Sequence, residues 1–119
     1  MKNKLITTSL LIAAVLILLG VIITGSQDKK VNNSVIFFYG NTCPHCAEVE
    51  KWMEENKVAD KIKVDKKEVY ENSQNALELT EVARSCGLPT DNIGVPFLYA
   101  DGKCFIGTPN VEAYLGAKK

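Results

Sequence analysis

The chain has no excess of positive charge, no internal repeat and no low-complexity tract. Its 119 residues include 14 Lys+Arg and 14 Asp+Glu, so the formal net charge at pH 7 is zero. Without Lys2 and Lys4, the part from Gln27 onward has 12 basic against 14 acidic residues, a net charge of −2. Because domains that bind nucleic acid carry a basic patch or stripe, we expect no nucleic-acid partner. The length suits one small domain.

Charged residues are also absent from residues 5–24, LITTSLLIAAVLILLGVIIT. A helix of that length spans about 30 Å, which is the thickness of the hydrocarbon core of a bilayer. Two lysines precede the segment and favour a cytoplasmic amino terminus, although Lys29 and Lys30 after it weaken the bias. We expect a single-pass signal anchor in the cell membrane, with a cytoplasmic tail 1–4, a transmembrane anchor 5–24, a linker 25–33 and an extracytoplasmic domain 34–119.

A cleaved signal peptide is the alternative interpretation of the same segment. Thr24, Gly25 and Ser26 are small residues near a point where cleavage is feasible. The apolar run is, however, longer than the hydrophobic region of about 7 to 15 residues that signal peptides use. Both interpretations place the domain outside the cytoplasm, in an environment where disulfides persist. The domain contains all four cysteines, Cys43, Cys46, Cys86 and Cys104.

The exported part predicts an α/β domain. Residues 35–39, VIFFY, form a β-branched and aromatic run before Gly40, which is typical of a strand buried on both faces. Val49 and Met53 follow at helical spacing and predict core positions of a helix from Pro44 to about residue 56. Further strands are expected at 62–64, 97–99 and 104–106, the last two joined at Asp101-Gly102 as a hairpin.

Two more helices follow from capping signals. Asn75 and Glu78 have the spacing of a capping box, and an apolar stripe at Ala76, Leu79, Ala83 and Cys86 then runs to Gly87. Thr108-Pro109 predicts an N-cap and a first-turn proline for a helix that continues to residue 115. The predicted order is strand, helix, strand, helix, strand, strand, helix.

The chemistry-bearing motif is Cys43-Pro44-His45-Cys46, at the start of the first of these helices. With Cys43 at the N-cap, Pro44 occupies N1, where its missing N–H is not needed. Backbone N–H groups and the helix dipole then stabilise a Cys43 thiolate and should lower the pKa of its thiol. Cys43 is therefore the predicted nucleophile, and the more sheltered Cys46 is the predicted resolving thiol.

His45 admits two interpretations. It can place positive charge beside the Cys43 thiolate, which would stabilise the reduced protein and make the disulfide more oxidising. Alternatively, it is a solvated residue of the first turn.

A metal site and a structural staple are the other interpretations of the cysteines. Tetrahedral zinc needs four ligands, and the four cysteines can nominally supply them, but the chain has no second close-spaced pair. A staple across so short a loop would remove little entropy from the unfolded chain. A non-enzymatic metal carrier remains the alternative class of function, and we assign no metal ligand.

Together, the order of elements, the Cys-Pro-His-Cys motif and Gly94-Val95-Pro96 before the third strand resemble the thioredoxin superfamily over about residues 34–117. The motif is similar to that of DsbA-type thiol oxidases. The size is similar to glutaredoxins and to the thioredoxin-like domains associated with vitamin K epoxide reductase homologues. The resemblance implies a thioredoxin-like fold (β-α-β-α-β-β-α), a cis Pro96, and a Val95 backbone that binds the substrate chain near Cys43.

The resemblance also implies a thiol–disulfide oxidoreductase without a cofactor, acting through Cys43 and Cys46 as an oxidant of protein thiols. A reductase or isomerase of the same fold is the alternative. The expected partners are protein thiol or disulfide substrates and a membrane redox protein similar to vitamin K epoxide reductase or DsbB. In this topology the second helix ends near Cys104, so Cys86 and Cys104 form a second disulfide or stay two buried thiols.

Overall fold

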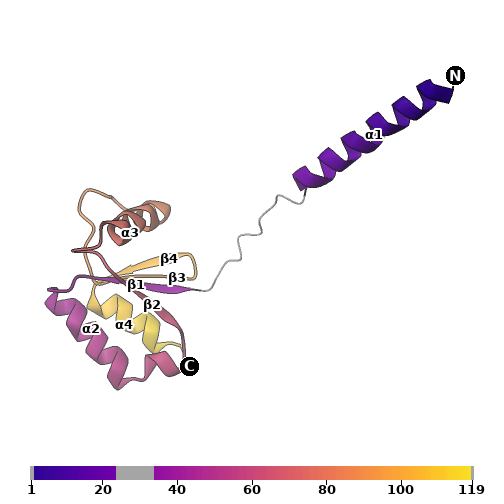
Figure 1. The fold of residues 1–119 in the computed structure, drawn as a ribbon. Helices are drawn as coiled ribbons and strands as arrows, with labels where there is room; N and C mark the ends of the chain where they lie inside the picture. Colours follow the sequence, from indigo (N-terminus) through magenta and orange to yellow (C-terminus); the bar gives the residue numbers. More distant parts are fainter. Residues whose placement is uncertain (1, 24–33, 119) are drawn as a thin grey trace. The chain divides into compact units, whose positions relative to one another are not determined.

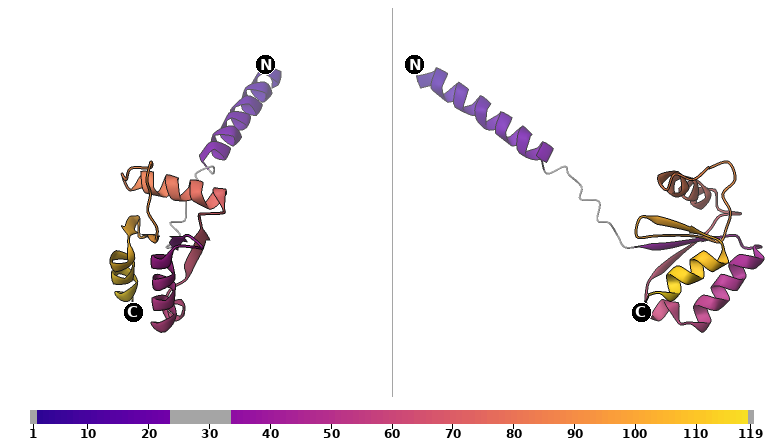
Figure 2. Two further views of the ribbon diagram at one scale, coloured as in Figure 1. Left: turned by 90° about the vertical axis from the view of Figure 1, so that its left-hand side faces the viewer. Right: turned by 180° about the vertical axis from the view of Figure 1, so that it is seen from behind.

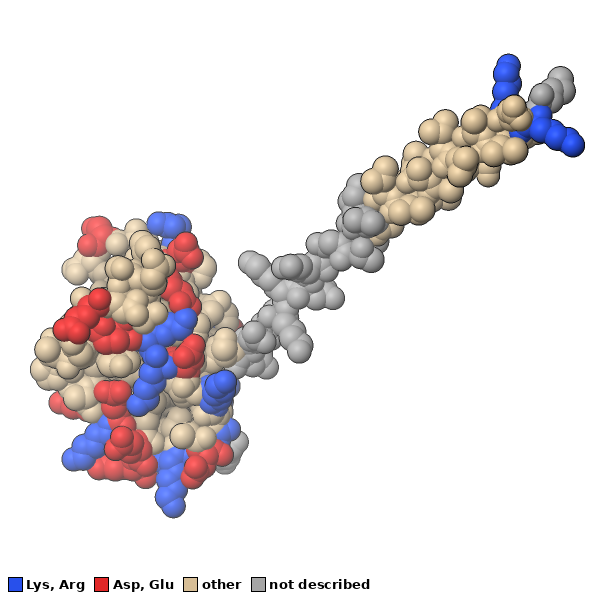
Figure 3. Space-filling view, viewed as in Figure 1, with Lys and Arg blue, Asp and Glu red and all other residues tan. Residues whose placement is uncertain are grey.

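The computed structural model describes residues 2–23 and 34–118, in two units, Met1–Asn32 and Asn33–Lys119. In the first unit, α1 (Lys2–Ile23) carries exposed leucine, isoleucine and valine side chains along its length, and Figure 3 shows charge at its N-terminal end alone. Its Lys2–Gly20 part is long and apolar enough to cross a membrane, a property that signal sequences share. Thr24 and the expected linker 25–33 lie outside the described residues.

The second unit is built on a four-stranded mixed sheet with the strand order β2-β1-β3-β4 (Figure 1). The strand β1 (Val35–Tyr39) pairs in parallel with β2 (Val64–Glu68) and antiparallel with β3 (Phe97–Ala100). The hairpin partner of β3 is β4 (Lys103–Ile106). The predicted order of elements is confirmed.

Helices cover both faces of this sheet. Figures 1 and 2 show α3 (Ser73–Ser85) on one face and α2 (Pro44–Glu55) with α4 (Thr108–Gly116) on the other. Successive strand residues point to opposite faces, so Phe37 packs in the α2 and α4 layer and Phe38 in the α3 layer, and both are fully buried. This explains why β1 has no polar face. Val49 and Met53 are buried, as their helical spacing predicts.

Two predicted helix starts are wrong. The helix α3 begins at Ser73, and its N-cap is Asn72, whose Oδ1 accepts hydrogen bonds from the N–H groups of Gln74 and Asn75 at 3.1 Å each. Glu78 contacts Lys67 of β2 and makes no capping box. In α4, Gly107 (φ 86°) takes the cap position, so Thr108 is the first helical residue.

Smaller differences concern the strands. Asp101 and Gly102 both adopt positive φ, 53° and 72°, so they alone make the hairpin turn, and β3 and β4 are each one residue longer than predicted. The strand β2 begins at Val64, two residues later than predicted, after a short 3₁₀ helix η1 (Val58–Asp60) that the sequence did not indicate. These changes leave Cys43 where the sequence predicts it, between β1 and α2.

Candidate active site

Cys43 occupies the N-cap of α2, as its place before Pro44 predicts. Its backbone is extended (φ −88°, ψ 112°), Pro44 follows in the first turn, and the Cys43 Sγ accepts a hydrogen bond of 3.2 Å from the N–H of Cys46. One of the first backbone donors of the helix is therefore aimed at the sulfur. This donor and the positive end of the helix dipole favour negative charge on Cys43.

Cys43 and Cys46 form a disulfide, with their Cα atoms 5.2 Å apart. Cys46 is 1% exposed and Cys43 is 8% exposed. The first sulfur is the more accessible of the two, although less open than its N-cap position alone suggests. The carbonyl oxygen of Val95 lies 3.8 Å from the Cys43 Sγ and accounts for part of this shielding.

The turn before Cys43 is held by a close ring contact. The N–H of Cys43 donates to the carbonyl of Gly40 at 3.1 Å. A Cβ on residue 40 would stand 2.2 Å from the ring of Tyr70, so the turn and this ring fit together only because residue 40 is glycine. Tyr70 follows β2, and its ring is thereby placed against the active-site turn.

Glu68, the last residue of β2, joins the same turn to the segment that leads into α3. Its carboxylate accepts from the N–H groups of Asn41 (3.3 Å), Tyr70 (2.6 Å), Glu71 (2.9 Å) and Asn72 (3.2 Å). Burial acts to raise the pKa of Glu68, but these four N–H donors outweigh it and hold the pKa below its ordinary value. Glu68 is thus a charged anchor for two loops.

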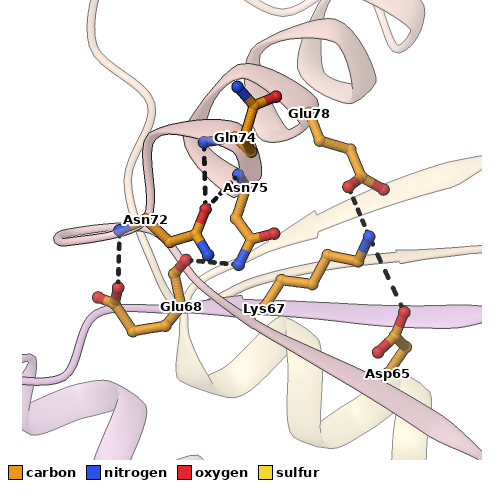
Figure 4. A network of polar contacts seen from close by, with 7 residues as sticks. All are labelled: Asp65, Lys67, Glu68, Asn72, Gln74, Asn75 and Glu78. Carbon is orange, nitrogen blue, oxygen red and sulfur yellow. Dashed lines mark hydrogen bonds and ion pairs between the residues drawn. The ribbon is translucent and has the colours of Figure 1, made fainter.

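Figure 4 shows how this anchor continues into α3. The side-chain amide of Asn75 donates to the backbone carbonyl of Glu68 at 2.9 Å, and Lys67 reaches both Asp65 and Glu78. Neither Glu68 nor Tyr70 was a predicted site residue. The second strand was predicted to end at residue 64, so Glu68 was not placed at its carboxyl end, where the parallel strands β1 and β2 meet at one edge of the sheet.

Val95 and Pro96 stand beside the disulfide, on the chain segment that enters β3. Their peptide bond is cis, as the resemblance implies, and the Pro96 carbonyl accepts from the N–H of Gly107 at 3.0 Å. A hollow of about 430 Å³, here named the Pro96 hollow, opens next to them; it is lined by His45, Val95, Pro96, Gly107, Thr108 and Pro109. The hollow therefore connects the start of α2 with the start of α4.

The His45 side chain is directed to Glu48. It is 74% exposed, and its Nδ1 lies 3.2 Å from Oε2 of Glu48, one turn further along α2. The exposed ring and its place in the first turn agree with the interpretation of a solvated first-turn residue. Any positive charge on the ring is, however, partly balanced by the Glu48 carboxylate.

Cys86 and Cys104 form a second disulfide, with Cα atoms 6.2 Å apart, between the C-cap of α3 and β4. The Cys104 Sγ lies 3.7 Å from the carbonyl oxygen of Val82. In the described part of the chain no cysteine is free, and no three metal-binding side chains come together. The four sulfurs are therefore paired in two places and do not present one tetrahedral set.

Comparisons with known proteins support the fold. No protein-family profile and no curated protein sequence matches the chain. Glutaredoxin 1 from Francisella tularensis, solved in complex with cacodylate, has 23% identity and a TM-score of 0.50, with 70% of this chain and 92% of that chain covered. A wheat glutaredoxin (20% identity, TM-score 0.48, 70% of each chain covered) and a buckwheat glutaredoxin–glutathione complex (18%, 0.48, 69% of each) were also found. The second unit has the glutaredoxin-like form of the thioredoxin fold.

Proposed function

We propose that this protein is a membrane-anchored thiol–disulfide oxidoreductase that exchanges disulfides through Cys43 and Cys46. The observation that carries the proposal is the placement of the Cys43 sulfur, at a helix N-cap, against an N–H donor and next to Val95 and Pro96. A sulfur in this setting is a good leaving group in one direction of exchange and a good nucleophile in the other.

In the oxidising direction, a substrate thiolate attacks the Cys43 Sγ. The Cys43–Cys46 bond breaks, its electron pair leaves with Cys46, and a mixed disulfide joins the substrate to Cys43. A second substrate thiolate then attacks the substrate sulfur of the mixed disulfide, and Cys43 leaves as a thiolate. The substrate has lost two electrons and two protons, and the protein holds a dithiol. In the reducing direction Cys43 is the nucleophile and Cys46 resolves the mixed disulfide.

We assign the oxidising direction. The helix N-terminus stabilises the reduced protein through the Cys43 thiolate, and His45 adds positive charge to the same turn when it is protonated. A reductase or isomerase is the second candidate, because the Glu48 carboxylate beside His45 reduces the net positive charge of the turn. A His45→Tyr variant separates the two: the oxidant assignment expects its potential to fall by tens of millivolts, whereas an unchanged potential favours the second candidate.

The proposed location is the outer side of the cell membrane. It is supported by the apolar helix α1 with lysines at its start and by two disulfides in one small domain. In this proposal residues 5–24 are the anchor and 25–33 the linker. Anchoring at the bilayer suits a membrane redox partner, similar to vitamin K epoxide reductase or DsbB, that reoxidises Cys43 and Cys46. A reporter fused after Lys119 should be extracytoplasmic; a cytoplasmic reporter would refute this location.

A trapping experiment tests the function itself. In Cys46→Ser, Cys43 can attack a substrate disulfide, and the resulting mixed disulfide lacks the Cys46 thiol that would resolve it. Substrate proteins should therefore remain attached to Cys43 on a non-reducing gel. Cys43→Ser should trap nothing. Trapping by Cys43→Ser in place of Cys46→Ser would reverse the two roles, and trapping by neither would refute disulfide exchange at this site.

A further inference from the structure

A second hollow also reaches Val95. It has a volume of about 510 Å³, and residues of α3, of the segment after β2 and of the loop before β3 line it. We name it the Tyr70 hollow, after its wall residue; Leu79, Thr80, Thr90, Ile93 and Val95 are among the others. Residues of α3 line it, whereas residues at the starts of α2 and α4 line the Pro96 hollow. Figure 1 shows α3 and the pair α2 and α4 on opposite faces of the sheet.

Val95 is the residue that the two hollows share, and its carbonyl oxygen is 3.8 Å from the Cys43 sulfur. Both volumes fall within the range of about 300 to 1,000 Å³ of pockets that hold ligands. A molecule that reacts with Cys43 therefore meets one hollow in each layer, with the reacting sulfur near their common residue.

Neither hollow carries a fixed charge. Among the described lining residues there is no lysine, arginine, aspartate or glutamate, and His45 in the Pro96 hollow and Tyr70 in the other are the titratable groups. At the α4 end, Pro109 removes one backbone N–H from the first turn of the helix. A substrate that brings carboxylates to the Tyr70 hollow would lose hydration without gaining an ionic partner.

Tyr70 is placed as a fixed contact surface. Its N–H is held by Glu68 at 2.6 Å and its ring rests against Gly40, yet the residue is 55% exposed. An aromatic ring that is already ordered offers contact area at little further entropic cost. Leu77, on the outer side of α3, is exposed to a similar degree at 60% but does not line the hollow.

We propose that the substrate of Cys43 is an extended polypeptide that crosses Val95 and places uncharged side chains in the Tyr70 and Pro96 hollows. This inference rests on the proposed function. A peptide with apolar residues beside its reactive cysteine fits both hollows. Glutathione, a tripeptide with two carboxylates, finds no lysine or arginine in either of them and is a poor substrate.

The test uses the oxidised full chain in detergent micelles and three two-cysteine peptides of equal length. One peptide has leucine and valine beside its first cysteine, one has aspartates and one has lysines; reduced glutathione and dithiothreitol are the small-thiol references. Reduction of Cys43–Cys46 is followed by alkylation and mass spectrometry, with rates corrected for the thiolate fraction. We expect the apolar peptide to react about tenfold faster than the aspartate peptide and glutathione.

Variants identify the residues that cause the preference for the apolar peptide over the aspartate peptide. Tyr70→Ala should abolish most of the tenfold preference, Tyr70→Phe should keep it, and Asn92→Lys at the exposed rim of the Tyr70 hollow should accelerate the aspartate peptide. Leu77→Ala, the matched control on the same helix, should change nothing. An aspartate peptide that reacts as fast as the apolar one in wild type, or a Tyr70→Ala variant with the full preference, overturns the inference alone. A chain that does not react even with dithiothreitol overturns the proposed function and this inference together.

Discussion

The two disulfides of the domain stand at opposite ends of their helices. Cys43 is the N-cap of α2, where the helix dipole and the N–H of Cys46 stabilise a thiolate. Cys86 is the C-cap of α3, at the negative end of the dipole, and its partner sulfur on Cys104 faces the carbonyl of Val82. We therefore expect the Cys43–Cys46 bond to be reduced more readily than the Cys86–Cys104 bond.

Loop length strengthens the contrast. The first disulfide joins residues three apart and constrains the unfolded chain little, whereas the second joins residues 18 apart, across the loop that leads to Val95 and Pro96. Helix position and separation in the chain thus assign exchange to one pair and stability to the other. Both pairs are disulfides, so it is the position of each cysteine on its helix that distinguishes their expected chemistry.

The largest expected effect separates the pairs by activity. Cys43→Ser should reduce thiol–disulfide exchange to the uncatalysed rate, while the Cys86→Ala/Cys104→Ala double variant should keep its exchange rate within about twofold at a temperature where it is folded. Turnover of a fluorescent disulfide-linked peptide measures both. Loss of activity in the double variant despite a native circular dichroism spectrum would break the comparison.

The second prediction concerns stability. Removing the Cys86–Cys104 bond should lower the free energy of unfolding by about 3 kcal/mol, the order expected for a loop of this length. Reduction of the Cys43–Cys46 bond should leave the free energy of unfolding unchanged or raise it, because the folded protein stabilises the Cys43 thiolate. Denaturant unfolding of each form, with the other disulfide intact, gives the two values; equal losses would contradict the division of roles.

The Glu68 anchor should make the active-site turn sensitive to acid. The folded-state pKa of Glu68 lies below its unfolded value of about 4.5, so its contribution is fully present above that value and is lost as pH falls through the folded pKa. The difference in the free energy of unfolding between wild type and Glu68→Gln should therefore be larger at pH 6 than at pH 3. If this difference is equal at pH 6 and pH 3, the charge of Glu68 does not hold the turn.

The smallest expected effect is at Thr108. Its Oγ1 is buried and has no hydrogen-bond partner among the described residues, so replacing the hydroxyl with a methyl group in Thr108→Val should be neutral or stabilise the fold by about 1 kcal/mol. Thermal unfolding measures this, and Thr108→Ser, which keeps the hydroxyl, is the control. A clear loss of stability in Thr108→Val would mean that the hydroxyl has a bonding role at the wall of the Pro96 hollow.

Local sequence signals predicted the parts of the molecule that depend on neighbouring residues. The uninterrupted run at 35–39 gave a strand buried on both faces, and Cys43-Pro44 gave the N-cap that defines the site. The cap of α3 was wrong because Asn75 and Glu78 match a capping box locally, while Asn72 and the Lys67–Glu78 contact depend on where β2 lies. Gly40 and Tyr70 meet across 30 residues of chain, and no local pattern contains that contact.

The reduction potential of Cys43–Cys46 tests the central claim most directly. It is measured on the full chain by equilibration with dithiothreitol buffers, with each cysteine's state read by alkylation. The account predicts a potential closer to about −120 mV, as in strongly oxidising members of this fold, than to about −270 mV, with Cys86–Cys104 still intact where the first pair is fully reduced. A value below about −230 mV, or reduction of Cys86–Cys104 before Cys43–Cys46, would contradict it.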